Sequence, residues 1–414
     1  MLEIEKIIND ICPDGVEYKP LWELTAWDKR FNGLDRSMQK KVISYKYYLS
    51  SEFDEVERED GDVLYISTGT SSEKRYTTEE LAGEHLAEGE IVCIPWGGTP
   101  NVKYHKGKFV TGDNRIATSL DTTVLDNKFL YYWMQSQIKT IASFYRGAGI
   151  QHPSMKSVLE MLVPLPPLAA QREIVHVLDK FTLLSSELAA ELAARQEQYK
   201  YYRNKLLSFE DIEVVELKDI AEIGTGSHNT NEELEEGEYP FFVRSQDVRR
   251  LNTFDFDETA IITSGDGVGV GKIFHYIEGK YALHQRAYRI KITDKNVNPK
   301  YFYYYMKATF FDYIQKTAVN SSVTSIRRPM LEQFKVPVPT IEAQNRLVYV
   351  LDNFDTVCSD LKIGLPAEIE KRQQQYEYYR DKLLTFDTKS ATIFDRQTDR
   401  QTDRQTDRQT DRQG

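Results

Sequence analysis

The chain carries the same sequence twice, and no other feature constrains its fold as strongly. Residues 163–181 and 336–354 are identical at about 10 of 19 aligned positions. A second pair follows, because 195–209 returns as 372–386 with the same Tyr-Tyr-Arg and Lys-Leu-Leu runs. A duplication of this length predicts a molecule with two similar halves, which suits a target with two parts.

Length and composition are those of a soluble globular protein. The 414 residues predict several domains, and 40% apolar with 28% charged residues are ordinary values. No apolar run reaches the roughly 18 residues that span a bilayer, and the acidic residues after Met1 do not fit a secretory signal. The three cysteines (Cys12, Cys93 and Cys358) are far apart, which argues against disulfides and for a reducing cytoplasm.

Each repeat predicts a long helix. Apolar residues within 168–208 recur at alternating spacings of four and three from Ile174 and Leu178 onward, the pattern of a coiled-coil seam. At 1.5 Å per residue this helix would be roughly 60 Å long. The second copy has about four additional residues around Gly364-Leu365-Pro366, and the proline should break or kink the helix there.

The stretches before the two repeats share a layout. Residues 16–160 and 211–335 begin with a Val-Glu-x-Lys strip, continue with short apolar runs split by turn residues, and close on an aromatic-rich helix. We therefore expect an α+β fold. Two mixed α/β domains with short strands are separated by two long antiparallel coiled-coil helices in a pseudo-two-fold cyclic arrangement. The predicted segments are a first variable domain (1–162), a central repeat (163–210), a second variable domain (211–335), a C-terminal repeat (336–388) and a tail (389–414).

The tail repeats a tetrapeptide. Asp-Arg-Gln-Thr recurs without error from Asp395 to Thr410, and a tract without apolar side chains should be disordered. The DNA unit GACA, read in threes, encodes this tetrapeptide, so replication slippage by one unit would shift the reading frame. We interpret the tract either as the mark of a phase-variable gene or as a harmless read-through, and both interpretations stay open.

The sequence offers no convincing catalytic site. It has neither an Asn-Pro-Pro-aromatic methyltransferase motif nor a Walker A sequence, and no two of its seven histidines stand four residues apart. The Gly-rich run 265–272 lacks P-loop spacing, so it predicts a turn between strands or a loop lying close to a DNA backbone. The net charge of −11 counts against nucleic-acid binding unless the local surface is basic or a basic partner supplies part of it.

Polar and basic residues among aromatics remain in both variable domains. Arg, Gln and Asn carry the paired donors and acceptors that match guanine and adenine edges, whereas Lys and Arg hold phosphates. For any single residue a solvated surface is the simpler explanation, but for the set DNA contact is favoured. The candidates are Arg75, Trp96, Lys103, Tyr104, Lys106, Asn114 and Arg115 in the first domain, and Arg244, Ser245, Gln246, Lys272, His284, Gln285, Arg286, Tyr288, Arg327 and Arg328 in the second.

This paired arrangement resembles the specificity (S) subunit of a Type I restriction–modification enzyme. The resemblance covers about 10–387, and it rests on Val-Pro-Leu-Pro-Pro to Gln at 163–171, its copy at 336–344, and the Tyr-Tyr-Arg-x-Lys-Leu-Leu ends. The stretches 239–245 and 279–284 are similar to one class of target recognition domain. The resemblance implies that each variable domain is a target recognition domain for one half of a bipartite DNA site. The long helices would then set the unread spacer.

The same resemblance implies partners and cofactors. The chain would be a non-catalytic subunit that binds double-stranded DNA and no membrane. It would dock two modification (methyltransferase) subunits and restriction (ATP-dependent translocase/nuclease) subunits through the exposed helix faces and the Tyr-rich ends. No cofactor is expected in this subunit, while S-adenosylmethionine, ATP and Mg are expected in the partner subunits. The interrupted second helix and the repeat tail depart from the family pattern.

Two alternatives stay open. One is the DNA-recognition part of a fused restriction–methylation enzyme, against which the missing methyltransferase motif counts. The other is a coiled-coil scaffold that does not bind DNA, against which the polar and basic loops count.

Overall fold

The chain folds into two compact units. The computed structural model describes residues 12, 15–71, 73–209, 212–317, 325–359 and 364–387. Unit 1 lies within 1–186 and 371–414, and unit 2 comprises 187–370. No helix in these described ranges is long and apolar enough to cross a membrane. The repeat tail predicted over 389–414 lies outside them.

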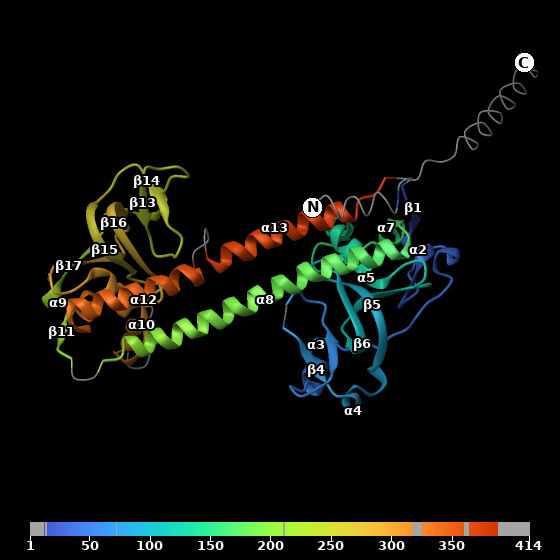
Figure 1. Cartoon of the computed structure of the whole chain (residues 1–414), viewed down its shortest axis with the longest axis horizontal. Helices are drawn as coiled ribbons and strands as arrows, with labels where there is room; N and C mark the ends of the chain where they lie inside the picture. Colours follow the sequence, from blue (N-terminus) through green and yellow to red (C-terminus); the bar gives the residue numbers. More distant parts are fainter. Residues whose placement is uncertain are drawn as a thin grey trace, which may run out of the picture. The chain divides into compact units, whose positions relative to one another are not determined.

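A six-stranded sheet forms the centre of unit 1 (Figure 1). Its order is β2-β7-β5-β6-β3-β4, and every neighbouring pair is antiparallel except β3 and β6. The strands are β2 (Thr25–Trp27), β3 (Val63–Ile66), β4 (Arg75–Thr77), β5 (Ala87–Pro95), β6 (Lys103–Thr111) and β7 (Asn114–Ser119). Two smaller sheets pair β1 (Glu17–Pro20) with β10 (Leu162–Leu165), and β8 (Tyr145–Arg146) with β9 (His152–Pro153). The short helices are α2 (Leu21–Leu24), η1 (Arg36–Gln39), α3 (Ser50–Val56), α4 (Glu79–Ala82), η2 (Gly83–His85), α5 (Asn127–Ser136), α6 (Ile138–Ser143) and α7 (Met155–Leu159).

Unit 2 repeats the topology of the central sheet strand for strand. Its sheet has the order β12-β17-β15-β16-β13-β14, again with one parallel pair, β13 and β16. The strands are β12 (Ala221–Thr225), β13 (Tyr239–Phe242), β14 (Arg249–Leu251), β15 (Phe256–Ser264), β16 (Phe274–Leu283) and β17 (Ala287–Ile292). A separate pair joins β11 (Val214–Glu216) to β18 (Lys335–Pro337), and the shorter helices are α9 (Leu217–Ile220), η3 (Thr230–Glu232), α10 (Pro299–Thr317) and α11 (Arg328–Glu332). The duplication therefore extends through the variable domains, where the sequences differ.

Each central sheet is buried by apolar side chains from the aromatic helix that follows it. In unit 1, Val92 and Ile94 of β5 share a core with Phe129 and Leu130 of α5. The opposite sheet face has its own cluster, which includes Phe109. Because both faces are covered, residues 91–94 form an unbroken buried run and not an alternating pattern. In unit 2, α10 covers the sheet in the same way.

The predicted helix over 168–208 is present as α8 (Leu168–Leu206). Its seam is confirmed as far as Leu192, since Phe181, Ser185, Leu188 and Leu192 are half-buried while the residues between them are exposed. The later seam positions Arg195 and Tyr202 are exposed, so the prediction was wrong there. The second copy is interrupted, as its proline predicts. The helix α12 (Ile341–Ser359) ends before Gly364, and α13 (Leu365–Leu383) begins with Pro366 in its first turn.

The two helical segments pack antiparallel within each unit. In unit 1, Phe181 stacks on Tyr379 with ring centroids 5.4 Å apart, while the earlier Leu178 shares a core with the later Leu383. In unit 2, Tyr199 and Tyr202 of α8 lie against Phe354 of α12, and Leu207 packs with Leu351. The α+β fold with two sheet domains and long antiparallel helices is therefore the one predicted.

The first and last described stretches meet in unit 1. The backbone N–H of Val16 donates to the carbonyl of Asp387 at 2.9 Å, and the hydroxyl of Tyr18 donates to the carbonyl of Phe386 at 2.8 Å. The repeat equivalent of Phe386 is Phe209, which the chain itself connects to β11. A covalent connection in unit 2 is thus replaced by hydrogen bonds in unit 1, which makes the architecture cyclic.

Candidate nucleic-acid interface

Three loops meet at one end of each central sheet, and we call this place the loop edge of the unit. In unit 2 it consists of 243–248, 265–273 and 284–286, held together by Gly265 N–H to Arg286 O and by His284 N–H to Phe242 O, both at 2.9 Å. In unit 1 the corresponding bonds are Trp96 N–H to Asp113 O and Gly112 N–H to Ile66 O, also at 2.9 Å. The same backbone network therefore frames two loop edges with different side chains.

The loop edge of unit 1 is built around a stacked pair. Arg115 is buried, its guanidinium lies 4.0 Å from the ring centroid of Trp96, and it pairs with Asp113 at 2.9 Å. The ring of His152 also lies close, with its centroid 5.0 Å from that of Trp96. Trp96 itself is half-buried. The indole is therefore held in one position, while the donors of Arg115 are engaged inside the unit.

Two further candidates brace the loop after β3. The side-chain amide of Asn114 donates to the carbonyl of Ile66 at 2.8 Å, and Asn114 is buried. The ammonium of Lys103 donates to the carbonyl of Ser67 at 2.7 Å, and burial lowers its pKa. Lys103, Trp96, Asn114 and Arg115 are thus brought together, although most of their donors are used within the protein.

The other three candidates of unit 1 lie elsewhere or are engaged. Arg75 begins β4, pairs with Asp54 and Glu57, and lies over aromatic rings. Tyr104 donates to Glu90 at 2.6 Å, and Lys106, which is exposed, pairs with the same carboxylate at 3.5 Å. Tyr104 directly follows Lys103 on β6, and Lys106 stands farther along this strand from the loop edge.

The loop edge of unit 2 carries exposed guanidinium groups. Arg244 pairs with Asp266 at 2.6 Å, and Arg286 pairs with the second oxygen of Asp266 at 3.3 Å. Burial alone would raise the pKa of Asp266, but the hydrogen bond from Arg244 and the two positive charges outweigh it and lower that pKa. One carboxylate therefore orients two cations that remain largely in solvent.

His284 supports this cluster from beneath. It is buried, and its Nδ1 accepts the backbone N–H of Arg286 at 3.0 Å. Desolvation, followed by the charge of Arg244, lowers its pKa, so the ring is neutral at pH 7. Gln285 beside it is exposed and donates to the side chain of Asn229.

Of the remaining candidates of unit 2, some are exposed and others form hydrogen bonds within the unit. Ser245 donates to the carbonyl of Asp247 at 3.0 Å, Gln246 is exposed next to it, and the hydroxyl of Tyr288 donates to the carbonyl of Ile326 at 3.4 Å. The bond from Ile326 N–H to Gly265 O at 2.8 Å brings the exposed Arg327 to the loop edge.

Two other candidates point elsewhere. Lys272 lies over the ring of Phe311 at 5.1 Å. Arg328 pairs with Glu332 at 2.8 Å and lines a hollow with Thr293, beside the opposite end of β17. The side chain of Arg328 is therefore directed away from the loop edge, although its neighbour Arg327 lies there.

The Gly-rich run is the turn between β15 and β16, and the structure explains its glycines. A Cβ on Gly265 would come within 2.5 Å of the carbonyl oxygen of Arg286, so only glycine lets the two loops approach. Gly267 and Gly271 have φ angles of +85° and +70°. Between them Val268 is 101% exposed, an apolar side chain at a loop tip that residue-type matching missed. The run 265–272 holds two valines among four glycines, and Val270 is buried, so the sequence alone does not single out Val268.

A bound metal ion needs a cluster of ligating side chains. Within the described ranges no group of three or more His, Cys, Asp or Glu residues is placed to hold a metal ion. The two loop edges instead present Arg, Gln, Trp and Val side chains on a fixed frame. The fold and these edges define a protein with two recognition modules that share long helices.

Comparison with known proteins identifies the family to which this chain belongs. The model described as "Type I restriction modification DNA specificity domain" matches residues 43–195 and again 209–371. The chain therefore belongs to the family of Type I specificity subunits.

Curated relatives agree over most of their length. The Type I restriction enzyme EcoR124I/EcoR124II specificity subunit of Escherichia coli is 33% identical over 93% of this chain and 97% of its own. A putative Type I restriction enzyme specificity subunit of Haemophilus influenzae is 27% identical over 72% of this chain and 83% of its own.

Solved structures show the same fold. The S subunit of a Type I restriction–modification system from M. genitalium has a TM-score of 0.60 at 18% identity, over 89% of this chain and 96% of that one. A chain from a study of complex assembly and conformational transition of a Type I system has a TM-score of 0.52 at 15% identity, over 90% and 98%.

Proposed function

We propose that this specificity subunit reads a bipartite DNA site, with one half contacted by each loop edge. The observation that carries the proposal is that the two loop edges share their backbone hydrogen bonds but differ in their side chains. Unit 1 presents Trp96 stacked on Arg115, whereas unit 2 presents Arg244 and Arg286 around Asp266. Because guanidinium and amide groups discriminate base edges, unlike loop edges on one frame fit unlike half-sites.

The distribution of charge supports DNA as the ligand despite the net charge of −11. Arg244, Arg286 and Arg327 are exposed at the loop edge of unit 2, and Asp266 pairs with the first two of them. DNA responds to this local field more than to the total charge. The subunit would act in the cytoplasm, in keeping with its scattered cysteines.

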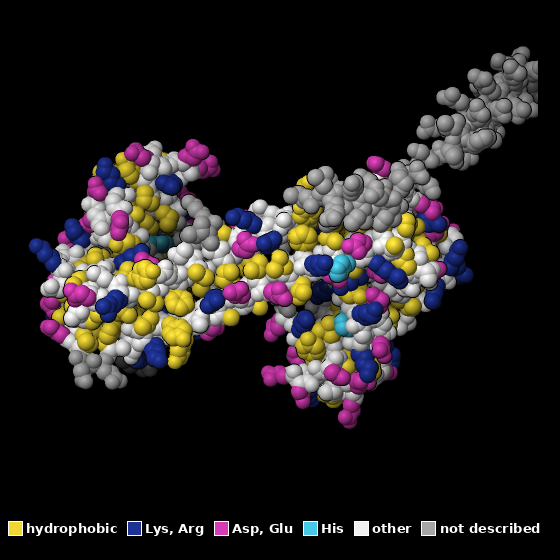
Figure 2. All heavy atoms as spheres, viewed as in Figure 1, with side chains coloured by type: hydrophobic (Ala, Val, Ile, Leu, Met, Phe, Trp, Pro, Cys, Tyr) yellow, Lys and Arg dark blue, Asp and Glu magenta, His cyan; other side chains and the backbone are white. Residues whose placement is uncertain are grey.

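Repeated apolar positions support the docking of two identical partners. Val350 and Val357 stand seven apart on α12 and are exposed. Their repeat equivalents on α8 are Val177, which is half-buried, and the exposed Leu184. Figure 2 shows hydrophobic side chains gathered over the helices of both units. The same surface presented twice suits two copies of one protein, which we take to be modification subunits.

We assign the chemistry to those partners. This chain would supply DNA recognition and be non-catalytic, while modification subunits bring S-adenosylmethionine and restriction subunits bring ATP and Mg. The tail is a separate proposal: slippage within its tetranucleotide tract would make the C-terminus phase-variable. Sequencing the tract from single colonies tests this, and an invariant repeat number across many colonies would refute it.

A charge reversal tests the DNA-reading role. Arg286→Glu, at the loop edge, should weaken DNA binding by the complex with modification subunits roughly tenfold or more, because it places an acid against phosphates or base acceptors. Arg328→Glu is the matched control, since this arginine lies at the opposite end of β17. Equal binding by both variants and the unchanged protein would contradict the proposal.

A further inference from the structure

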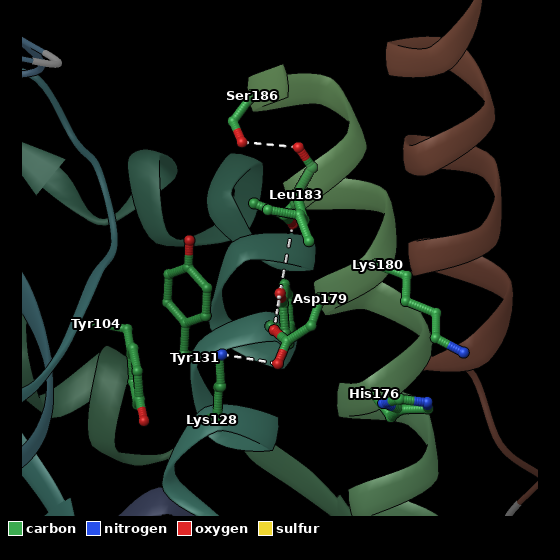
Figure 3. Close-up of a pocket in the computed structure, with 10 residues that line it drawn as sticks. Tyr104, Lys128, Tyr131, His176, Asp179, Lys180, Leu183 and Ser186 are labelled. Carbon is green, nitrogen blue, oxygen red and sulfur yellow. Dashed lines mark hydrogen bonds and ion pairs between the residues drawn. The ribbon is translucent and has the colours of Figure 1, made fainter. Parts of the chain in front are cut away.

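Each unit contains the same polar joint between its aromatic helix and its long helix. In unit 1 the ammonium of Lys128 lies 2.7 Å from one oxygen of Asp179 (Figure 3). The hydroxyl of Tyr132 donates to the other oxygen at 2.6 Å. Lys128 and Tyr132 stand on one face of α5, four residues apart, so a single carboxylate on α8 receives both.

Unit 2 repeats the joint atom for atom. Lys300 lies 2.8 Å from one oxygen of Asp352, and Tyr304 donates to the other at 2.6 Å. These residues belong to α10 and α12, the equivalents of α5 and the start of α8. Two independent units thus keep one geometry, although their loop edges differ.

A second contact anchors the start of each long helix. The side-chain amide of Gln171 accepts the N–H of Asp126 at 2.8 Å, and it donates to the carbonyls of Val124 and Pro166 at 2.8 and 2.9 Å. Gln344 makes the equivalent three bonds, to Asn298, Asn296 and Pro339. Both glutamines are completely buried.

The two contacts together fix a direction. In each unit the aspartate follows the glutamine by eight residues, which is about 12 Å along a helix. In unit 1 the buried Ile174 and Leu178 pack the intervening turns of α8 against the core. Apolar packing is non-directional, whereas the two polar contacts, one at each end of this stretch, fix the angle of the helix to the recognition domain. The joint carboxylate is therefore placed to set that angle.

Stability alone does not account for the joint. Asp179 and Lys128 keep 37% and 31% of their side-chain exposure, and Asp352 and Lys300 keep 36% and 37%. Each joint borders an open hollow, of about 610 Å³ in unit 1 and 600 Å³ in unit 2. The half-exposed lysine–aspartate pairs contribute little to stability because water screens them. The hydroxyls of the buried Tyr132 and Tyr304 hold each carboxylate in one orientation, so the repeated arrangement indicates a geometric role.

We infer that Asp179 and Asp352 are positioning residues that hold each recognition domain at a fixed angle to its long helix, and so restrict the spacer between the half-sites. This inference rests on the proposed bipartite recognition. The angle of each domain to its helix decides where its loop edge falls along DNA, one step of which is 3.4 Å. A loosened joint should therefore relax spacer length and leave base identity unchanged.

The test measures methylation by the assembled complex on DNA with both half-sites and spacers of the native length, one base pair shorter and one longer. Asp179→Ala should raise the relative rate on the altered spacers about tenfold, since misplacement of this size is what the joint prevents. Asp352→Ala should do the same from the other unit. Asp179→Asn keeps an acceptor for Tyr132 and should be intermediate.

Controls separate the outcomes. Glu187→Ala removes an exposed carboxylate from α8 and should change nothing. If the aspartate variants do not fold, Lys128→Met and Tyr132→Phe carry the test. Unchanged spacer selectivity, an equal loss on all spacers, or altered half-site bases would overturn the inference. If the unsubstituted complex recognises no split site at all, bipartite recognition itself fails.

Discussion

At the scale of single residues, some side chains that could contact bases by their type instead form hydrogen bonds and ion pairs within the protein. Asn114 and Arg115 match base edges by type, yet both are buried and bonded within unit 1. Arg286 has the same guanidinium as Arg115, but its side chain is 62% exposed. The difference depends on burial, which residue type does not reveal.

The buried glutamines lead to a stability prediction. Gln171→Leu leaves one backbone N–H and two carbonyls without partners, so the free energy of unfolding should fall by about 3 kcal/mol. Chemical denaturation measures this loss. Gln344→Leu should lose a similar amount, whereas Gln196→Leu, on the exposed surface of α8, should be neutral. A neutral Gln171→Leu would contradict the assignment.

Val268 leads to a prediction of the opposite kind. Its side chain is fully exposed, so Val268→Asp should change the free energy of unfolding by less than about 0.5 kcal/mol. DNA binding should nevertheless fall roughly tenfold, because the acid would face phosphates. Val214→Asp, on β11, is the control, and equal binding by both variants would remove this loop tip from the interface.

At the scale of elements, local pattern and long-range pairing were predictable to different degrees. The seven-residue spacing of Phe181, Leu188 and their neighbours predicted α8, and Pro366 predicted the interruption of the second copy. The six-stranded order and the parallel β3–β6 pair were not predictable, since strand pairing joins distant residues without a local signal. The shared layout predicted two similar domains, but it could not show that their strands pair in the same order, because few residues are identical there.

The interrupted second copy gives an element-scale prediction. From Ile341 to Leu383 it is about four residues longer than α8. Deleting 363–366 should shorten it by about 6 Å, a little under two base-pair steps of 3.4 Å. We expect a shorter unread spacer with unchanged half-sites, read from the methylated motif. A changed half-site would refute the assignment of spacer length to the helices and of base recognition to the two domains.

At the scale of the whole molecule, the chain follows a cyclic path. Unit 1 gathers the first and last described stretches, and Val16 and Tyr18 bond to 386–387 where unit 2 has a continuous chain. The duplication alone predicted two similar halves. It did not predict that the boundary between the units would fall within the long helices, after Ser186 and before Lys371. That boundary depends on which half of each helix packs in which core.

Circular permutation tests this path. Joining Asp387 to Met1 and opening the chain between Phe209 and Ile212 exchanges the covalent and non-covalent connections of the two units. Because few contacts need change, the permutant should fold and direct methylation to the same split motif. Circular dichroism and the methylated sequence check this. A permutant that folds but recognises another motif would contradict the equivalence of the two connections.

The central claim is that one chain reads two half-sites. Mapping adenine methylation across the host genome with and without this gene tests it most directly. The account predicts that one split motif disappears with the gene, with two short defined halves around a fixed unread gap. Persistence of every methylated motif, with the modification partner present and active, would contradict it.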